Sequence, residues 1–292
     1  MVQFRSAAMI VNAKSRKGQK LFQRACAAMD GLDFPVDAHA VENPDDLEAT
    51  VERALAKKPD LVILGGGDGT VSGLVDLLVG KGVTLAVLPL GTANSFARTL
   101  GLPIDVEGAI EVIRKGVPKR IDLGMIDDDY FANCAAMGIS PQIAETVPHG
   151  LKKVLGRIGY LGWAAWQFVR FKPFMLTIDD GVETHRLRVV EVRISNGPYH
   201  GGTWLVDEAS VQSGRIVVQA VTGRYKRTLV KNWAASFLGL KARHQDTVSF
   251  SGTALKVDTR PSLLISIDGE VLAHTPITAR VAAGAIEVMA PA

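Results

Sequence analysis

The sequence is poor in cysteine: its 292 residues include only Cys26 and Cys134, which are too few for a disulfide scaffold. It also lacks any run of the roughly 20 apolar residues that a membrane-spanning helix needs. The first residues have a short apolar run and no cleavage pattern, which argues against a signal peptide. These absences predict a cytoplasmic protein whose thiols are free.

Several familiar binding motifs are absent as well. No glycine precedes Lys-Ser or Lys-Thr in the frame of a Walker phosphate loop, and the dinucleotide fingerprint fails at Thr70, which stands where its last glycine should be. There is no helix-turn-helix or zinc pattern, and the net charge is only +3. Nucleic acid is therefore not expected as a partner.

Residues 61–70 give the strongest local signal. They read Leu-Val-Ile-Leu-Gly-Gly-Gly-Asp-Gly-Thr, in which four apolar residues are typical of a buried parallel strand and the glycines leave the backbone open to a ligand. Apolar residues at helical spacing follow at 71–78. A strand, a glycine turn and a helix in this order direct free backbone N–H groups to one place, where a phosphate would bind.

An acid lies inside this turn, at Asp68. A carboxylate beside bound phosphates repels them unless a divalent cation lies between, so Asp68 indicates either Mg²⁺ or a catalytic task. The alternative is a plain strand-to-helix turn in which Asp68 only caps the helix.

The first 125 residues alternate between strand and helix patterns, which predicts an α/β domain with a parallel sheet and a ligand at the carboxyl ends of its strands. Polar segments at 12–18 and 89–100 each follow a predicted strand, and either could contact a nucleotide or be a turn or helix cap. We expect strands at 7–11, 36–41, 61–64 and 85–88, and helices at 21–29, 45–56, 71–78 and 106–115.

Residues 126–292 are dominated by short strand patterns and predict a β-sandwich-like second domain. The first part holds 15 of the 33 Lys and Arg and 15 of the 30 Asp and Glu, so the whole positive excess lies in the second part. Helical patterns at 151–170 and 228–240 carry basic and aromatic residues that fit either packing onto the sheet or docking on anionic lipid. We expect strands at 130–134, 174–178, 187–194, 215–221, 247–250, 263–267 and 285–289.

Two more acids lie near the C-terminus, in Asp268-Gly269-Glu270. Asp-Gly is a common hairpin turn, and the local sequence favours that interpretation. The functional alternative is that one carboxylate accepts a proton from a substrate hydroxyl while the other helps to hold metal or water.

Five motifs in this order resemble the diacylglycerol kinase catalytic-domain family, which includes bacterial diacylglycerol-type lipid kinases and sphingosine kinases. The resemblance runs from about residue 5 to the C-terminus. The motifs are Gly66-Gly67-Asp68-Gly69-Thr70, Pro89-Leu90-Gly91-Thr92-Ala93-Asn94, Asp122-Leu123-Gly124, the segment from Asn196-Gly197 to Gly201-Gly202, and Asp268-Gly269-Glu270.

The resemblance implies an ATP-binding α/β domain at 1–125 and a β-sandwich lipid-substrate domain at 126–292, whose last strand could return to the first domain. The active site would lie in the cleft between them. Asp268 and Glu270 would be general base and partner in an unassigned order, and Asp68 and Asp122 would arrange Mg²⁺. The implied nucleotide site consists of Asn12, Ala13, Lys14, Ser15, Arg16, Gly66, Gly67, Asp68, Gly69, Thr70, Thr92 and Asn94.

The implied activity is transfer of the γ-phosphoryl group of ATP to the hydroxyl of a membrane lipid such as diacylglycerol or a sphingoid base. The partner would be an anionic membrane surface, reached from the cytoplasmic side, and a homodimer is left open. Two alternatives stay open: a kinase of a soluble metabolite, similar to NAD kinases, and a nucleotide-binding regulator without catalysis.

The sequence departs from the family pattern at several positions. Ser72-Gly73 stands where the family commonly has Asn-Glu, which removes a carboxylate and places more of the metal handling on Asp68. Ser213 stands where bacterial relatives carry an aspartate that binds a structural Mg²⁺, so that second site is not expected here. Ala13, Arg16 and Val41 also differ from the usual residues around the nucleotide.

Overall fold

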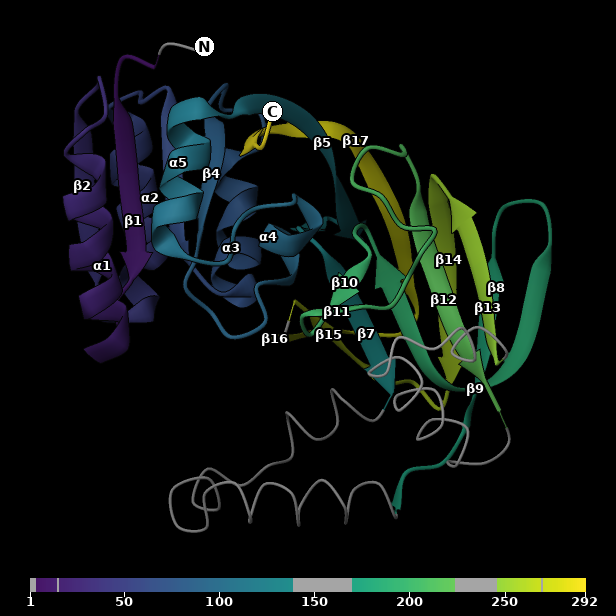
Figure 1. Cartoon of the computed structure of the whole chain (residues 1–292). Coiled ribbons are helices and arrows are strands. Elements are labelled where there is room, and N and C mark those ends of the chain that lie inside the picture. The colour runs from purple at the N-terminus through teal and green to yellow at the C-terminus, as the bar shows by residue number, and fades with distance from the viewer. Residues whose placement is uncertain (1–3, 15, 139–169, 224–245, 269) are drawn as a thin grey trace.

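The computed structural model describes residues 4–14, 16–138, 170–223, 246–268 and 270–292. The predicted helices at 151–170 and 228–240 fall almost wholly outside the described residues. The N-terminal half is an α/β domain and the C-terminal half is β-rich, so the predicted fold class is confirmed (Figure 1).

The N-terminal domain contains a parallel sheet in the order β4-β3-β1-β2. Its strands align in register, with Ala7 opposite Leu61 and Leu61 opposite Thr84. The strands are β1 (Ala7–Asn12), β2 (Val36–Val41), β3 (Leu61–Gly66) and β4 (Thr84–Pro89), and the helices are α1 (Arg16–Met29), η1 (Pro44–Asp46), α2 (Leu47–Ala56), α3 (Asp68–Val75), η2 (Asp76–Leu78), α4 (Ser95–Thr99) and α5 (Val106–Lys115).

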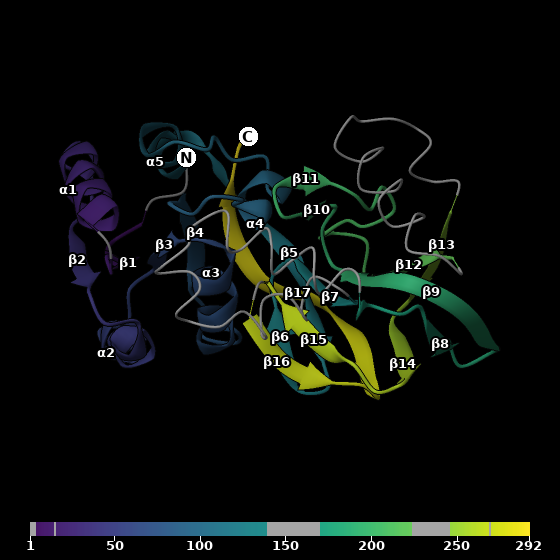
Figure 2. The ribbon, with the colours of Figure 1, turned by 90° about the horizontal axis from the view of Figure 1, so that it is seen from below.

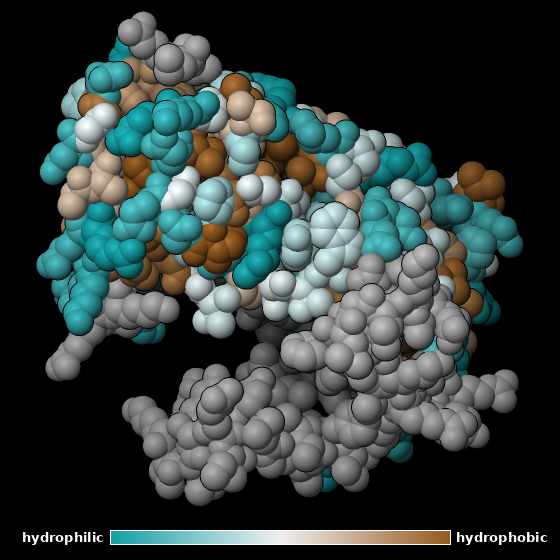
Figure 3. Space-filling view, in the orientation of Figure 1, coloured by the Kyte–Doolittle hydropathy of each residue, from teal (hydrophilic) through white to brown (hydrophobic). Residues whose placement is uncertain are grey.

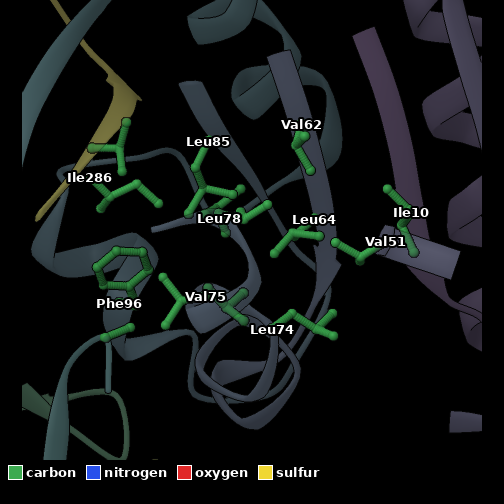
Figure 4. Packing of buried hydrophobic residues seen from close by; sticks show 14 of the residues in the cluster. Ile10, Val51, Val62, Leu64, Leu74, Val75, Leu78, Leu85, Phe96 and Ile286 are labelled. Carbon is green, nitrogen blue, oxygen red and sulfur yellow. The ribbon is translucent and has the colours of Figure 1, made fainter. Parts of the chain in front are cut away.

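Helices cover both faces of this sheet, with α1 and α5 on one face and α2 and α3 on the other (Figure 2). The strands β3 and β4 are buried along their whole length, which explains their nearly continuous apolar sequences. Leu74 and Val75 of α3 and Leu78 of η2 pack in one cluster with Leu64 and Leu85 of the sheet, which holds α3 against it (Figure 4). Figure 3 shows many hydrophilic side chains on the side of the N-terminal domain that faces the viewer in Figure 1, with smaller apolar areas between them.

The C-terminal half is built from antiparallel strands around a second core that includes Phe131, Val192, Val218 and Leu255. The hairpin of β10 and β11 turns at Gly201 and Gly202, which both have the positive φ that favours glycine. The strands are β5 (Val117–Ile126), β6 (Asp129–Phe131), β7 (Cys134–Gly138), β8 (Phe174–Asp179), β9 (Thr184–Ser195), β10 (Tyr199–His200), β11 (Thr203–Trp204), β12 (Ile216–Thr222), β13 (Thr247–Gly252), β14 (Ala254–Arg260), β15 (Leu264–Ile267), β16 (Glu270–His274) and β17 (Ile277–Ala290).

Two long strands join the halves. β17 pairs antiparallel with β5 and, near its end, parallel with β4, so that Glu287 lies opposite Thr84. The Thr84 hydroxyl donates a 2.6 Å hydrogen bond to the Glu287 carboxylate. The last strand of the chain therefore forms part of the first sheet.

Two strand predictions were wrong in detail, and other strands were not predicted. The strand expected at 130–134 is divided at Ala132 and Asn133, because β6 pairs with β5 whereas β7 pairs with β9 and β15. The strand expected at 285–289 is the end of β17, which starts at Ile277. No strands were predicted at β5, β10, β11, β14 and β16, although buried and more exposed residues alternate along β14.

Candidate active site

The glycine turn between β3 and α3 has the predicted geometry. Gly67 is the residue before α3, and its carbonyl accepts a 3.1 Å hydrogen bond from the Val71 N–H. Residues 67–70 are only partly buried, so their backbone is open to a ligand. A Cβ on Gly91 would lie 2.5 Å from the Cα of Gly67, which shows that the turns after β3 and β4 meet backbone to backbone.

The segment after β1 lies beside this turn. The Asn12 side chain donates a 3.2 Å hydrogen bond to the hydroxyl of Thr70 and accepts one from the Lys14 N–H. Ala13 is fully buried, and its N–H donates to the Val41 carbonyl. Ser15 and the Arg16 side chain lie outside the described residues. The structure therefore brings Asn12 and Thr70 together at the predicted edge of the sheet.

Asn94 holds the turn after β4 in shape. It has a positive φ, is buried, and its side chain accepts from the Gly91 N–H and donates to the Gly91 carbonyl. Its amide is thus engaged inside the turn, whereas Thr92 is exposed and faces outward. Their predicted contacts with a nucleotide stay predictions.

Asp68 is the first residue of α3, and its carboxylate serves a second helix. Its Oδ1 accepts a 3.0 Å hydrogen bond from the Phe96 N–H in the first turn of α4. Within the part of the chain that the structure describes, Oδ2 accepts no hydrogen bond. Asp68 therefore connects the two turns through one oxygen, and its predicted role in binding a ligand or metal with the other oxygen stays a prediction.

Asp268 reaches the same place from the other end of the chain. Its Oδ2 accepts from the Ser72 hydroxyl at 2.6 Å and from the Asn133 N–H at 3.1 Å, and its Oδ1 accepts from the Cys134 N–H at 2.9 Å. Asp268 has a positive φ of 44° and sits in the turn between β15 and β16. This turn conformation directs the carboxylate at α3.

The ionisation of Asp268 reflects opposing effects. Burial raises the pKa of its carboxyl to about 6, hydrogen bonds from Ser72, Cys134 and Asn133 lower it, and the nearby charge of Asp68 raises it. A carboxylate with a pKa near neutrality can accept a proton from an alcohol and release it afterwards. The raised pKa of Asp268 is compatible with the predicted general base, and the choice between Asp268 and Glu270 stays a prediction.

The two acids predicted beside Asp268 differ in what the structure says of them. Glu270 begins β16 opposite Ile267, and its side chain lies outside the described residues. Asp122 is buried in β5, where its two oxygens accept from the Gly214 N–H at 2.6 Å and the Gly284 N–H at 2.9 Å. Asp122 therefore connects the loop of Gly214 with strand β17, and its metal-binding role stays a prediction.

Two functional positions were missed in the sequence. Ser72 was treated only as a lost family residue, yet its hydroxyl contacts Asp268. Asn133 was treated as part of a strand, yet its side chain accepts from the Thr99 hydroxyl at 2.8 Å and donates to the Tyr199 carbonyl. A helical position one turn after Asp68 was a usable signal for Ser72; no local pattern identifies Asn133.

The donors present suit a Mg²⁺ ion that is shared with phosphates. The described residues include no group of three or more His, Cys, Asp or Glu side chains that could enclose a metal. Mg²⁺ in phosphoryl-transfer sites is held by one or two carboxylates, substrate phosphates and water. The second oxygen of Asp68 fits that manner of binding.

Two family models together match nearly the whole chain. The diacylglycerol kinase catalytic domain matches residues 6–126, and the YegS C-terminal NAD kinase beta sandwich-like domain matches residues 133–290. The chain belongs to the diacylglycerol kinase catalytic-domain family. The family assignment makes it a kinase.

Curated relatives agree with this family. A diacylglycerol kinase of Staphylococcus aureus (strain JH9) is 27% identical over 98% of this chain and 92% of its own. One of Staphylococcus epidermidis is 27% identical over 90% of this chain and 85% of its own. An uncharacterized protein of Synechocystis is also 27% identical, but the match spans only 57% of its length.

Solved structures share the fold. A diacylglycerol kinase of Bacillus anthracis str. Sterne superposes with a TM-score of 0.74 at 21% identity, covering 99% of this chain and 98% of that one. A further chain from the same organism reaches a TM-score of 0.80 at 23% identity, covering 99% and 96%. In the described residues, no helix is both long enough and apolar enough to cross a bilayer.

Proposed function

We propose that the protein is an ATP-dependent lipid kinase, which transfers the γ-phosphoryl group of ATP to the hydroxyl of a membrane lipid such as diacylglycerol or a sphingoid base. The observation that carries the proposal is the meeting of Asp268 with α3 beside the glycine turn, through the 2.6 Å hydrogen bond from Ser72. A phosphate-binding backbone and a carboxyl of pKa about 6 are what a kinase for an alcohol needs in one place.

In this reaction the backbone of residues 67–70 and the start of α3 bind the phosphates of ATP. The acceptor hydroxyl oxygen forms a bond to the γ-phosphorus while the bond from that phosphorus to the bridging oxygen of ADP breaks. The proton of the hydroxyl passes to Asp268. Mg²⁺, held by the free oxygen of Asp68, would neutralise the charge that spreads over the phosphoryl oxygens.

The lipid acceptor is supported by the relatives rather than by a described pocket. The Staphylococcus relatives that match along most of this chain are named diacylglycerol kinases. The NAD kinase-like description of the C-terminal model favours a second candidate, a soluble phosphate acceptor. Of these two candidates, only the lipid kinase would bind to the surface of anionic membranes.

Acceptor profiling with labelled ATP tests the proposal. The purified protein is incubated with mixed micelles that contain diacylglycerol, sphingosine or phosphatidylglycerol, and in parallel with NAD and with sugar phosphates. We expect label in a lipid product, and none with Asp268→Asn. Label only in a soluble acceptor would overturn the lipid assignment, and turnover by Asp268→Asn at the wild-type rate would overturn the role of the base.

A further inference from the structure

The side chain of Ser72 lies between two elements of different domains. Ser72 is on α3 and is 7% exposed. Its hydroxyl donates to Oδ2 of Asp268 at 2.6 Å and accepts from the Ala132 N–H at 3.1 Å. It thus connects the helix that follows the phosphate turn with the acid from the end of the chain.

The direction of these hydrogen bonds is fixed. A backbone N–H can only donate, so the Ser72 oxygen is the acceptor towards Ala132. The single hydrogen of the hydroxyl is then directed to Asp268. The distance of 2.6 Å lies in the range of a hydroxyl that donates to an ionised carboxylate.

We propose that Ser72 is a positioning residue for Asp268: its hydroxyl fixes the rotation of the carboxylate and favours the ionised form that accepts the substrate proton. The inference rests on the proposed function, because it assigns Asp268 the role of the base. Ser72 itself touches no reacting atom.

The backbone amides that bind Asp268 do not connect it to α3. The N–H groups of Asn133 and Cys134 hold the two carboxylate oxygens from one side, that of β7. Ser72 is the donor from α3, the element that carries Asp68. It is therefore the contact that relates the base to the phosphate turn.

Other titratable groups lie near Asp268 or near the residues that bind it, and they have to be considered when its titration is interpreted. Asp68 on α3 raises the pKa of Asp268 by its charge. Cys134 on β7 contributes a neutral thiol, because burial raises its pKa to about 12. The ring of His200 on β10 lies 3.1 Å from that thiol, and burial lowers its pKa.

A buried ion pair lies behind these groups. Glu191 and Arg193 on β9 pair at 3.0 Å, and both affect the charge state of Cys134 and His200. The Ser72→Ala substitution leaves this pair and its 3.0 Å contact in place. A change in the titration of Asp268 in that variant is therefore attributable to the lost hydroxyl.

The test compares Ser72→Ala with Ser72→Thr, which keeps the hydroxyl, and with Gly73→Ala. Gly73 is the next residue on the same helix, is exposed, and has open space where a Cβ would lie. Two quantities are measured for each full-length variant: the pH profile of kcat/KM, and the titration midpoint of Asp268 by ¹³C NMR of labelled aspartate without substrate. The Asp268→Asn spectrum assigns the resonance.

We expect Ser72→Ala to move the Asp268 midpoint up by about one pH unit, since a lost hydrogen bond to the charged form raises a carboxyl pKa. The rate should then fall about fivefold near pH 6 and stay close to the wild-type rate near about pH 8.5. Ser72→Thr should restore the profile, and Gly73→Ala should not change it. Ser72→Cys, whose thiol is a weaker donor, should shift the midpoint in the same direction if the alanine variant does not fold.

An unchanged Asp268 midpoint in a folded Ser72→Ala protein would overturn the inference, as would a rate loss that is equal at every pH. The NMR titration needs no acceptor, so the two proposals fail separately. A shifted midpoint in a protein that phosphorylates no lipid would uphold the role of Ser72 and reject the lipid kinase.

Discussion

The carboxylate of Asp68 accepts a hydrogen bond from the main-chain N–H of Phe96, 3.0 Å away on a different helix. This bond holds the glycine turn between β3 and α3 and the turn after β4 in one arrangement. The residue that makes it is the acid for which the sequence predicts a catalytic or metal-binding role. Capping and catalysis, which the sequence presents as alternatives, are compatible in one side chain because a carboxylate has two oxygens.

Asp68→Asn separates these tasks. The amide oxygen can still accept from Phe96, but the negative charge is gone. We expect a loss of phosphoryl transfer of at least about 10²-fold, with a thermal midpoint close to that of the wild type. The measurement is ATP turnover beside a melting curve.

Asp105 offers a matched control for Asp68. Its carboxylate caps α5 by accepting from the Gly108 N–H at 2.8 Å and has no contact with the phosphate turn. Asp105→Ala should lower the free energy of unfolding by about 1 kcal/mol and leave turnover intact. Normal turnover in Asp68→Asn would contradict the site assignment.

The pH dependence of activity should follow Asp268. Because burial raises its pKa to about 6, the base is protonated and inactive below that value and ionised above it. We expect kcat/KM to fall as the pH is lowered through about 6, with a slope of one proton. A profile that stays flat down to about pH 4.5, near the ordinary carboxyl range, would contradict this environment.

Asp122 should matter for stability more than for metal binding. Asp122→Ala leaves the N–H groups of Gly214 and Gly284 without their acceptor in a buried site. We expect the free energy of unfolding to fall by roughly 3 kcal/mol, while the Mg²⁺ concentration for half-maximal activity stays unchanged. Urea denaturation and a Mg²⁺ titration check the two parts.

Asp127 is the control for Asp122, since its exposed carboxylate accepts from the Thr278 N–H at 3.0 Å. Because Asp127 has a positive φ of 53°, which asparagine tolerates and alanine does not, the control variant is Asp127→Asn, which should cost less than about 1 kcal/mol. A raised Mg²⁺ requirement in Asp122→Ala, with stability preserved, would restore the metal role implied by the family resemblance.

Chelation should stop catalysis without unfolding the protein. The Ser213 hydroxyl donates within its own loop, where the carbonyl oxygens of Ser210 and Arg215 lie 2.9 and 3.1 Å away. This hydroxyl, already engaged inside its loop, stands at the position where a structural metal site would need an aspartate. Excess EDTA should abolish ATP turnover. It should move the thermal midpoint by less than about 2 °C, because removing a metal destabilises a folded protein only where that metal is bound, and no structural site is expected at Ser213. A large drop in the midpoint would indicate a structural ion.

Asn133 should govern how the two halves fit together. It accepts from the Thr99 hydroxyl on α4 and donates to the Tyr199 carbonyl on β10, and its N–H binds Asp268. Asn133→Ala leaves the half-buried Thr99 hydroxyl and Tyr199 carbonyl without this partner, while the main-chain N–H can still bind Asp268. We expect a loss of roughly 2 kcal/mol in the free energy of unfolding, and reduced turnover. Thr99→Val removes one of the contacts and should cost about 1 kcal/mol. Equal effects of the two variants would contradict the central place of Asn133.

The sequence predicts those parts of the site whose chemistry is local. The glycine turn, Asp68 and the strand that precedes them follow from neighbouring residues, and their positions are as expected. The approach of Asp268 to Ser72 depends on residues 196 positions apart, and only the ordered motifs of the family resemblance suggested it. Local sequence favoured a hairpin turn at Asp268, and the structure shows that this turn is what delivers the acid.

Long-range pairing also explains the errors. β5 carries Lys119, Arg120 and Asp122 in a strand whose partners are β17 and β6, so its pattern is not a simple alternation. Asn133 lies where the chain leaves one partner strand for another, and such a change of partner leaves no periodic signal.

The pairing of β17 with β4 has a consequence for biosynthesis. Residues 287 and 288 supply the neighbour of Thr84 and Leu85, so the first sheet keeps an open apolar edge until a segment 203 positions further along the chain has been synthesised. A nascent chain of the α/β half alone would expose that border, which is a template for aggregation. The sheet of the N-terminal half is therefore not self-sufficient, and a fragment that stops before residue 287 would lack the strand that covers β4.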